Sequence, residues 1–306
     1  MIELIHREKI EFQSIRPSDR AIFEQFAGQE QGRGCECTFA NLYMWGEQSL
    51  AVYAEHLTLL SVFGRRIVYP FPFGEGEKRG VIEALMADAR ERGIPFCLSS
   101  ITQASKQEIE RLYPDYFVFT ADEGSFDYVY DINDLADLPG KRYHAKRTHI
   151  NRFKEAHPHY TVSPLLGQEL FAVREMADAW YAARADAEDS FHGEKRALKR
   201  ALDAYEELAL EGLVLKDGNE VLAFTLGSRM SFDTFDVHFE KARADVQGAY
   251  PVINQAFASY IRQKHPEITY LDREEDMGIE GLRRAKRSYY PHHMIEKFYA
   301  RLKEKA

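Results

Sequence analysis

The chain of 306 residues has few cysteines and no long apolar run. Its three cysteines are Cys35, Cys37 and Cys97. An odd count with C-x-C spacing fits neither a disulfide framework nor a usual zinc site. No run approaches the roughly 18 apolar residues of a membrane-spanning helix. We therefore expect reduced thiols, no metal site and no transmembrane segment in a cytoplasmic protein.

The chain also has fewer basic than acidic residues: its 40 Lys and Arg and 49 Asp and Glu give a net charge of −9. A negatively charged protein repels duplex nucleic acid at long range, so no duplex DNA partner is expected. The length suffices for one large or two ordinary domains, each with its own core.

Both halves of the chain contain the same order of predicted elements. In each half, three strands are followed by a helix, a strand, a helix and a strand, with further helices in front. Asp217-Gly218-Asn219 is a strong hairpin signal, and Pro251 stands where a helix start tolerates proline. This order predicts an α+β fold with mixed sheets in two domains, residues 1–140 and 141–306.

A basic segment connects the two halves and contains no carboxylate before Glu155. We expect a helix over residues 143–155, because Tyr143, Ile150 and Phe153 form an apolar stripe. Cations beside aromatic rings suit a single-stranded RNA end, whereas the alternative is the solvated face of a linker helix. The basic residues of the segment are Lys141, Arg142, Lys146, Arg147, Arg152 and Lys154.

Two groups of polar residues are candidates for chemistry. Asp236, His238 and Glu240 alternate along a predicted strand, which places them on one face, either lining a cleft or facing solvent. The second group directly follows another predicted strand, where open sheets tend to bind ligands, although a solvated acidic turn is the alternative. This second group is Asp272, Arg273, Glu274 and Asp276.

The order of elements resembles the acetyltransferase fold called GNAT. In that fold, a loop after the fourth strand holds a pyrophosphate at the N-terminus of the next helix. The matching loop here, residues 239–251, contains Arg243, Gln247 and Gly248 but departs from the usual Q/R-x-x-G-x-G/A spacing. Tyr289 stands about where many GNAT enzymes have a tyrosine acid.

A more specific resemblance covers nearly the whole chain. Five segments in order resemble the DUF2156 family, which is similar to the C-terminal catalytic domain of phosphatidylglycerol lysyltransferases. The resemblance implies two GNAT-like domains with a cleft between them. It also implies transfer of an amino acid from aminoacyl-tRNA to an amine or hydroxyl, as in the Fem peptidoglycan transferases. The segments are residues 127–130, 140–153, 238–242, 248–255 and 272–291.

These patterns together predict direct aminoacyl transfer without a covalent intermediate, since no Ser-His-acid order or G-x-S-x-G elbow is present. The acceptor would be a small molecule, a peptide or a lipid. The alternatives are an N-acetyltransferase that uses acetyl-CoA and a non-catalytic binding module. The predicted catalytic residues are Asp236, His238, Glu240 and Tyr289. Substrate contacts are assigned to Asp272, Arg273, Glu274 and Asp276. Donor or anion contacts are assigned to Lys141, Arg142, Lys146, Arg147, Arg243, Gln247, Gly248, Arg283 and Lys286.

Overall fold

The computed structural model describes residues 9–27, 34–183 and 190–303. The backbone divides into two compact units, one of Met1–Phe126 with Ile295–Ala306 and one of Asp127–Met294. Each unit is built on one seven-stranded mixed sheet, with helices packed on it. The predicted α+β class is therefore confirmed.

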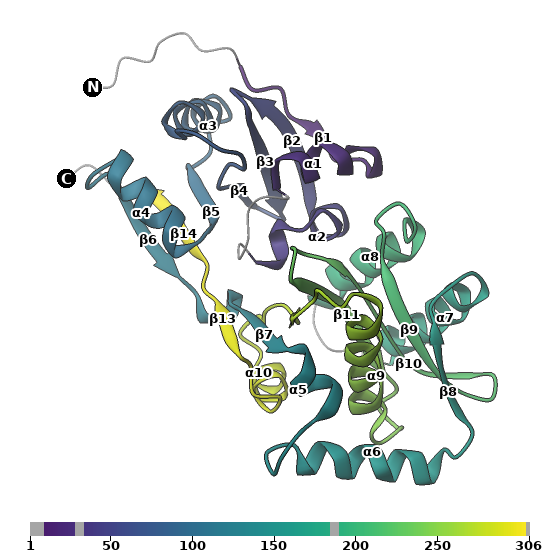
Figure 1. The fold of residues 1–306 in the computed structure, drawn as a ribbon. Helices are drawn as coiled ribbons and strands as arrows, with labels where there is room; N and C mark the ends of the chain where they lie inside the picture. The colour runs from purple at the N-terminus through teal and green to yellow at the C-terminus, as the bar shows by residue number, and fades with distance from the viewer. Residues whose placement is uncertain (1–8, 28–33, 184–189, 304–306) are drawn as a thin grey trace. The chain divides into compact units, whose positions relative to one another are not determined.

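The sheet of the first unit has the strand order β1-β2-β3-β4-β5-β14-β6 (Figure 1). Its strands are β1 (Gln13–Ser14), β2 (Glu47–Tyr53), β3 (His56–Phe63), β4 (Arg66–Pro70), β5 (Cys97–Ile101), β6 (Phe117–Ala121) and β14 (Phe298–Leu302). Its α-helices are α1 (Arg20–Ala27), α2 (Phe39–Met44), α3 (Arg79–Glu91) and α4 (Gln103–Leu112). The core of this unit is rich in aromatic side chains, because Tyr69, Phe96 and Phe117 pack together beneath α3 and α4.

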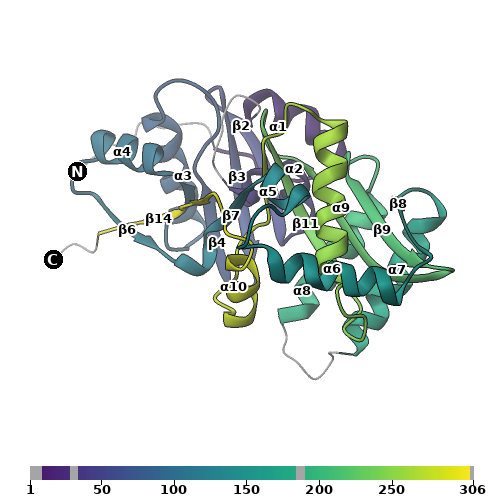
Figure 2. The ribbon, with the colours of Figure 1, turned by 60° about the horizontal axis from the view of Figure 1, so that its bottom comes forward.

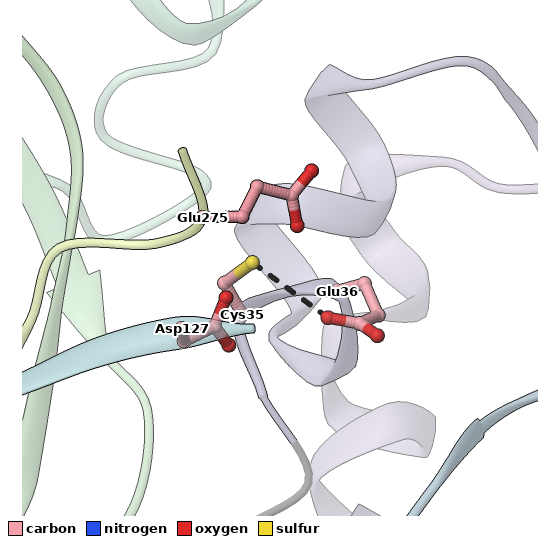
Figure 3. A group of neighbouring side chains, drawn as sticks. All are labelled: Cys35, Glu36, Asp127 and Glu275. Carbon is pink, nitrogen blue, oxygen red and sulfur yellow. Dashed lines mark hydrogen bonds between the residues drawn. The ribbon is translucent and has the colours of Figure 1, made fainter. Parts of the chain in front are cut away.

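A buried polar contact joins the C-terminal segment of the first unit to a short 3₁₀ turn, Cys35–Cys37. The Nζ atom of Lys297 lies 2.5 Å from the carboxylate of Glu36 and 3.8 Å from the sulfur of Cys35. The Cys35 thiol also donates to Glu36, at 3.7 Å (Figure 3). All three cysteines are buried, and none of them is in a disulfide.

The sheet of the second unit has the order β13-β7-β12-β11-β10-β9-β8. Its strands are β7 (Asp127–Asp131), β8 (Tyr160–Pro164), β9 (Glu211–Asp217), β10 (Glu220–Arg229), β11 (Thr234–Ala242), β12 (Tyr270–Asp272) and β13 (His293–Ile295). The Asp217-Gly218-Asn219 signal forms the β9–β10 hairpin as predicted, because Glu220 pairs with Asp217 and Gly218 takes a φ of +57°.

Helices cover the second sheet. They are α5 (Ile132–Asp137), α6 (His144–Ala156), α7 (Gln168–Ala182), α8 (Ser190–Asp203), α9 (Ala249–Lys264) and α10 (Glu280–Arg287). Helix α9 lies along the strands β9 to β11 in both views (Figures 1 and 2). Its residues Ile253, Phe257 and Ile261 are buried, since the 3.6-residue period places them on one apolar face. The predicted connector helix is α6, and its apolar residues Ile150 and Phe153 are buried.

The two sheets are related by their strand order. The first sheet contains five strands in chain order, β1 to β5, followed by β14 and then β6, and the second contains β8 to β12 in chain order, followed by β7 and then β13. β7 thus pairs with β12 in the second sheet, and β14 inserts between β5 and β6 in the first. The units therefore divide the chain at residues 126/127 and 294/295 rather than at the predicted boundary of 140/141.

Across the described ranges, no helix is both long enough and apolar enough to cross a bilayer.

Candidate functional site

The parallel strands β11 and β12 of the second unit separate after only three residues. Thr234–Asp236 of β11 pairs with Tyr270–Asp272 of β12, after which β11 continues to Ala242 while the chain beyond Asp272 leaves the sheet. Polar side chains gather at this separation. The predicted groups on β11 and after β12 are therefore neighbours in space.

A bulge interrupts the alternation of β11. Leu226 pairs with Phe239 and Ser228 pairs with Asp236. The segment from Asp236 to Phe239 on β11 is therefore one residue longer than the segment from Leu226 to Ser228 that lies opposite it on β10. The prediction that Asp236, His238 and Glu240 share one face is therefore wrong. Asp236 and His238 turn towards Ser228 of β10, whereas Glu240 pairs with Thr225 and contacts α9.

His238 lies at the centre of a buried group. Its Nε2 atom is 2.8 Å from the Ser228 hydroxyl oxygen, and its Nδ1 atom is 3.1 Å from a Glu274 oxygen and 3.4 Å from an Asp236 oxygen. The side chains of Asp236 and His238 are 0% exposed, and that of Glu274 is 16% exposed. Such a group can hold or transfer a proton, because an imidazole is bonded on both nitrogens to groups that exchange protons.

Glu240 is held by two donors from different elements. Its carboxylate accepts from Arg273 at 2.9 Å and from Asn254 of α9 at 3.1 Å. Burial acts to lower the pKa of Arg273, but Glu240, Tyr130 and Tyr289 together outweigh it and hold that pKa above its usual value. The guanidinium also lies over the Tyr289 ring, 5.0 Å from its centroid. This ion pair bridges the gap where the two strands diverge.

The loop after β12 is fixed by its own polar groups. The Asp272 carboxylate accepts from the backbone N–H of Glu274 at 2.7 Å, and Glu274 has a φ of +57°, which non-glycine residues rarely adopt. The Lys286 ammonium donates to the carbonyls of Arg273 and Glu274. Burial, together with the charge of Arg273, holds the pKa of Lys286 below its usual value.

Asp276 ends this loop as a buried carboxylate. It accepts from Arg283 Nε at 2.7 Å, from the Tyr128 hydroxyl at 2.6 Å and from the backbone N–H of Gly278 at 2.8 Å. Burial acts to raise the pKa of Asp276, but these hydrogen bonds, led by that of Arg283, hold it below the usual range. Asp276 thus connects α10 to β7 and positions Arg283.

Helix α6 brings one of its predicted cations to Tyr289. The Lys146 ammonium lies 3.7 Å from the centroid of the Tyr289 ring and donates to Ser288 at 2.7 Å. Burial, with the charge of Arg273, lowers the pKa of Lys146 to about 8. Burial likewise raises the pKa of the Tyr289 hydroxyl above its usual value. Lys146 and Tyr289 therefore adjoin the Arg273–Glu240 pair.

The other cations near α6 have different surroundings. Lys141 is exposed, Arg142 pairs with Asp134, and Arg147 donates to the carbonyl of Leu138. These contacts leave Lys141 and Arg142 at the surface of the helix start.

The loop before α9 is packed against α6. Gly248 has a φ of +90°, and a Cβ atom there would lie 2.6 Å from the carbonyl oxygen of His149 and 2.9 Å from Cβ of Phe153. Arg243 pairs with Asp245, and Gln247 is exposed. The helix start at which GNAT folds bind pyrophosphate is thus in contact with another helix in this chain.

Contacts join Asp236, His238 and Glu274 in one group and Glu240, Arg273, Tyr289 and Lys146 in another. Arg243 instead pairs with Asp245, and Lys141 and Gln247 are exposed. The structure also adds Ser228 and Asn254, which the sequence did not single out. Ser228 follows a run, residues 221–227, in which Thr225 is the one polar side chain, and this position was its signal.

Comparisons with known proteins place this geometry in context. The family described as "Phosphatidylglycerol lysyltransferase, C-terminal" matches residues 29–301. A solved structure of a conserved protein of unknown function from Bacteroides thetaiotaomicron VPI-5482 is 35% identical, with a TM-score of 0.91 over 96% of this chain and 100% of the other.

Two more distant structures are similar in fold. L-PGS from Bacillus licheniformis is 17% identical, with a TM-score of 0.65 over 96% of this chain and 94% of the other. A tandem GNAT protein from the clavulanic acid biosynthesis pathway is 8% identical, with a TM-score of 0.50 over 97% of this chain and 100% of the other. The predicted tandem GNAT-like fold is confirmed. None of the curated proteins compared with the chain matches it.

Proposed function

The chain belongs to the family of phosphatidylglycerol lysyltransferase C-terminal domains, and on this premise we propose that it moves an amino acid from aminoacyl-tRNA to an amine or hydroxyl acceptor. Membership, which confirms the predicted resemblance, makes the chain a transferase. The donor, the acceptor and direct transfer without a covalent intermediate are the proposed part. The cleft expected between the two domains stays a prediction.

The observation that carries the proposal is the buried group around His238, which is linked to the Arg273–Glu240 pair through the consecutive residues Glu274 and Arg273. Transfer requires that the acceptor lose a proton, that the ester carbonyl be polarised and that the leaving hydroxyl gain a proton. His238, held by Asp236 and Glu274, is placed to take the proton. The Arg273 guanidinium, one residue before Glu274, is the positive charge proposed to polarise the carbonyl oxygen.

Tyr289 is proposed to return a proton to the leaving tRNA hydroxyl. Its hydroxyl keeps its proton at neutral pH because burial raises its pKa, and an acid must be protonated before it can donate. Lys146 lies over the same ring, so a cation stands beside the place proposed for the tRNA end. Lys141, Arg142 and Arg147 on and before α6 would contact the phosphates that follow, since a single-stranded RNA end is bound by cations beside aromatic rings.

The direct test uses purified protein with tRNA charged with radiolabelled amino acids. Each charged tRNA is offered to a panel of amines and to vesicles containing phosphatidylglycerol. We expect label to leave the tRNA and enter one acceptor fraction only when the protein is present. His238→Gln should lower the rate by about 10²–10⁴-fold if the imidazole is the base. Glu280→Gln, which alters an exposed carboxylate on α10, is the matched control and should keep the wild-type rate.

Retention of label on every tRNA across the panel would count against the proposal, as would a His238→Gln protein with the wild-type rate. A parallel arm offers acetyl-CoA with the same amines. Acetylation in that arm, without loss of label from tRNA, would favour the acetyltransferase alternative instead.

A further inference from the structure

We propose that the groove between α6 and α9 binds the phosphate backbone of an RNA strand, which Arg147, Asn151 and Lys154 contact. RNA binding stands on the groove itself. Its use in holding the tRNA donor would rest on the proposed function, which gives no role to Asn151 or Lys154.

The groove has a volume of about 230 Å³ and is lined almost entirely by polar side chains. One wall is Gln255 of α9, and the other is a row of residues on α6. Members of this row recur every three or four positions, which places them on one face of the helix. They are His144, Arg147, Thr148, Ile150, Asn151 and Lys154.

The groove is positively charged in a protein whose net charge is −9. Its cations are Arg147 and Lys154, and none of the described residues that line it is a carboxylate. Lys154 is exposed and forms no ion pair with any other described residue. Glu155 is the single carboxylate of α6, and it lies outside the lining of the groove. A polyanion is therefore attracted to this side of α6.

Both walls of the groove are tied to the end of α5. Arg147 donates a guanidinium N–H to the carbonyl of Leu138, and the Gln255 amide donates to the carbonyl of Ala136 at 2.9 Å. A guanidinium has five N–H donors, so this contact fixes its plane and leaves other donors for a phosphate. Because Arg147 is already held, little side-chain freedom is lost when a strand binds.

The length and the chemistry of the row suit an RNA backbone. From His144 to Lys154 the helix rises about 15 Å, and phosphates along a duplex strand recur about every 3.4 Å, so the row can meet several of them. The described lining contains no Phe, Tyr or Trp on which a base could stack, so binding should not depend on the RNA sequence. None of the exposed large apolar side chains belongs to α6, which disfavours insertion into a membrane.

The test measures binding of fluorescently labelled, uncharged tRNA to the full-length protein by anisotropy, at salt concentrations from about 0.05 to 0.2 M. We expect the association constant to fall steeply with salt, because bound cations release counter-ions from the phosphates. Lys154→Gln should weaken binding about 10-fold and reduce the slope of log K against log salt by about 0.7–0.9. Arg152→Gln removes the same charge from an exposed position of α6 outside the groove, and it should keep both values.

Asn151→Leu separates a defined contact from a diffuse positive field. It removes a hydrogen-bond donor without changing the charge, so affinity should fall about 10-fold while the salt slope stays that of the wild-type protein. All three substituted residues are exposed, so the variants should fold, and thermal unfolding checks this.

The proposal is overturned if the wild-type protein does not bind tRNA at the lowest salt concentration, or if Lys154→Gln or Asn151→Leu keeps the wild-type affinity. It is also overturned if Arg152→Gln loses as much affinity as Lys154→Gln. Loss of binding to phosphatidylglycerol vesicles in Lys154→Gln, with tRNA affinity unchanged, would overturn it and assign the groove to a lipid. Since no amino acid or acceptor is present, a failure here is distinct from failure of the proposed transfer.

Discussion

Removing the charge of Glu240 should destabilise the second unit by about 3 kcal/mol, at the lower end of what breaking a buried ion pair costs. In Glu240→Gln, the Arg273 guanidinium loses its counter-ion although only 15% of its side chain reaches solvent. One hydrogen bond is lost as well, because Arg273 and Asn254 both donate to the carboxylate and an amide offers only one oxygen. Stacking of the guanidinium on Tyr289 remains and limits the loss.

The assay uses the two tryptophans of the chain, Trp45 and Trp180. In a Trp45→Phe background, fluorescence reports only Trp180 of the second unit. Its indole N–H donates to the carbonyl of Ala242 at 3.1 Å, two residues beyond Glu240 on β11. Urea slopes of about 1–3 kcal/mol per molar turn a loss of about 3 kcal/mol into a midpoint shift of about 1–3 M.

Two comparisons make this prediction refutable. Asp137→Asn breaks the exposed pair with Arg262 in the same unit and should cost less than about 1 kcal/mol. Arg273→Met combined with Glu240→Gln should cost clearly less than the sum of the single changes, because neither charge is then left buried alone. An effect of Glu240→Gln as small as that of Asp137→Asn, or strict additivity in the double variant, would refute the reasoning.

Three further predictions concern α6 and the loop that it contacts. Lys146 should lose its proton near pH 8 in a ¹⁵N NMR titration of its ammonium. The unfolded chain holds that proton up to about pH 10.4, so the free energy of unfolding of the wild-type protein should rise relative to that of Lys146→Met as the pH goes from about 8 to about 10.4. A difference between the two proteins that does not change with pH would contradict this. Gly248→Ala should cost about 1–3 kcal/mol more by urea unfolding than Gly218→Ala, since both have positive φ but only Gly248 faces another helix. Excess acetyl-CoA should leave the melting temperature unchanged, whereas a clear rise would show that the start of α9 binds the cofactor.

Much of the local structure follows from the sequence alone. The β9–β10 hairpin depends on the turn residues at 217–219, and α9 depends on an apolar stripe at helical spacing. The connector helix α6 and its buried Phe153 were predictable for the same reason. These features are set by contacts between residues close together in the chain, so a short pattern contains the information.

The candidate site could be predicted only in part. The polar residues of β11 and of the loop after β12 stand out, because polar side chains next to apolar strands are costly to bury. Their contact partners, Ser228 and Asn254, do not stand out in the sequence. A bulge of one residue in β11 determines that His238 contacts Ser228 while Glu240 turns to Asn254, and nothing in the alternation of residues 234–242 indicates it.

The division of the chain into units was decided by tertiary structure. A five-residue strand such as β7 or β14 can pair with any open sheet edge of suitable register, and its sequence does not specify that edge. β7 pairs with β12 and β14 with β5 and β6, which moves both boundaries away from residue 140. The sequence thus determined which segments become helices and strands, because that depends on near neighbours. Which strands share a sheet depended on pairings across more than a hundred residues, such as β7 with β12 and β14 with β5, and which side chains meet in the site depended on the register of those strands, which only the folded chain fixes.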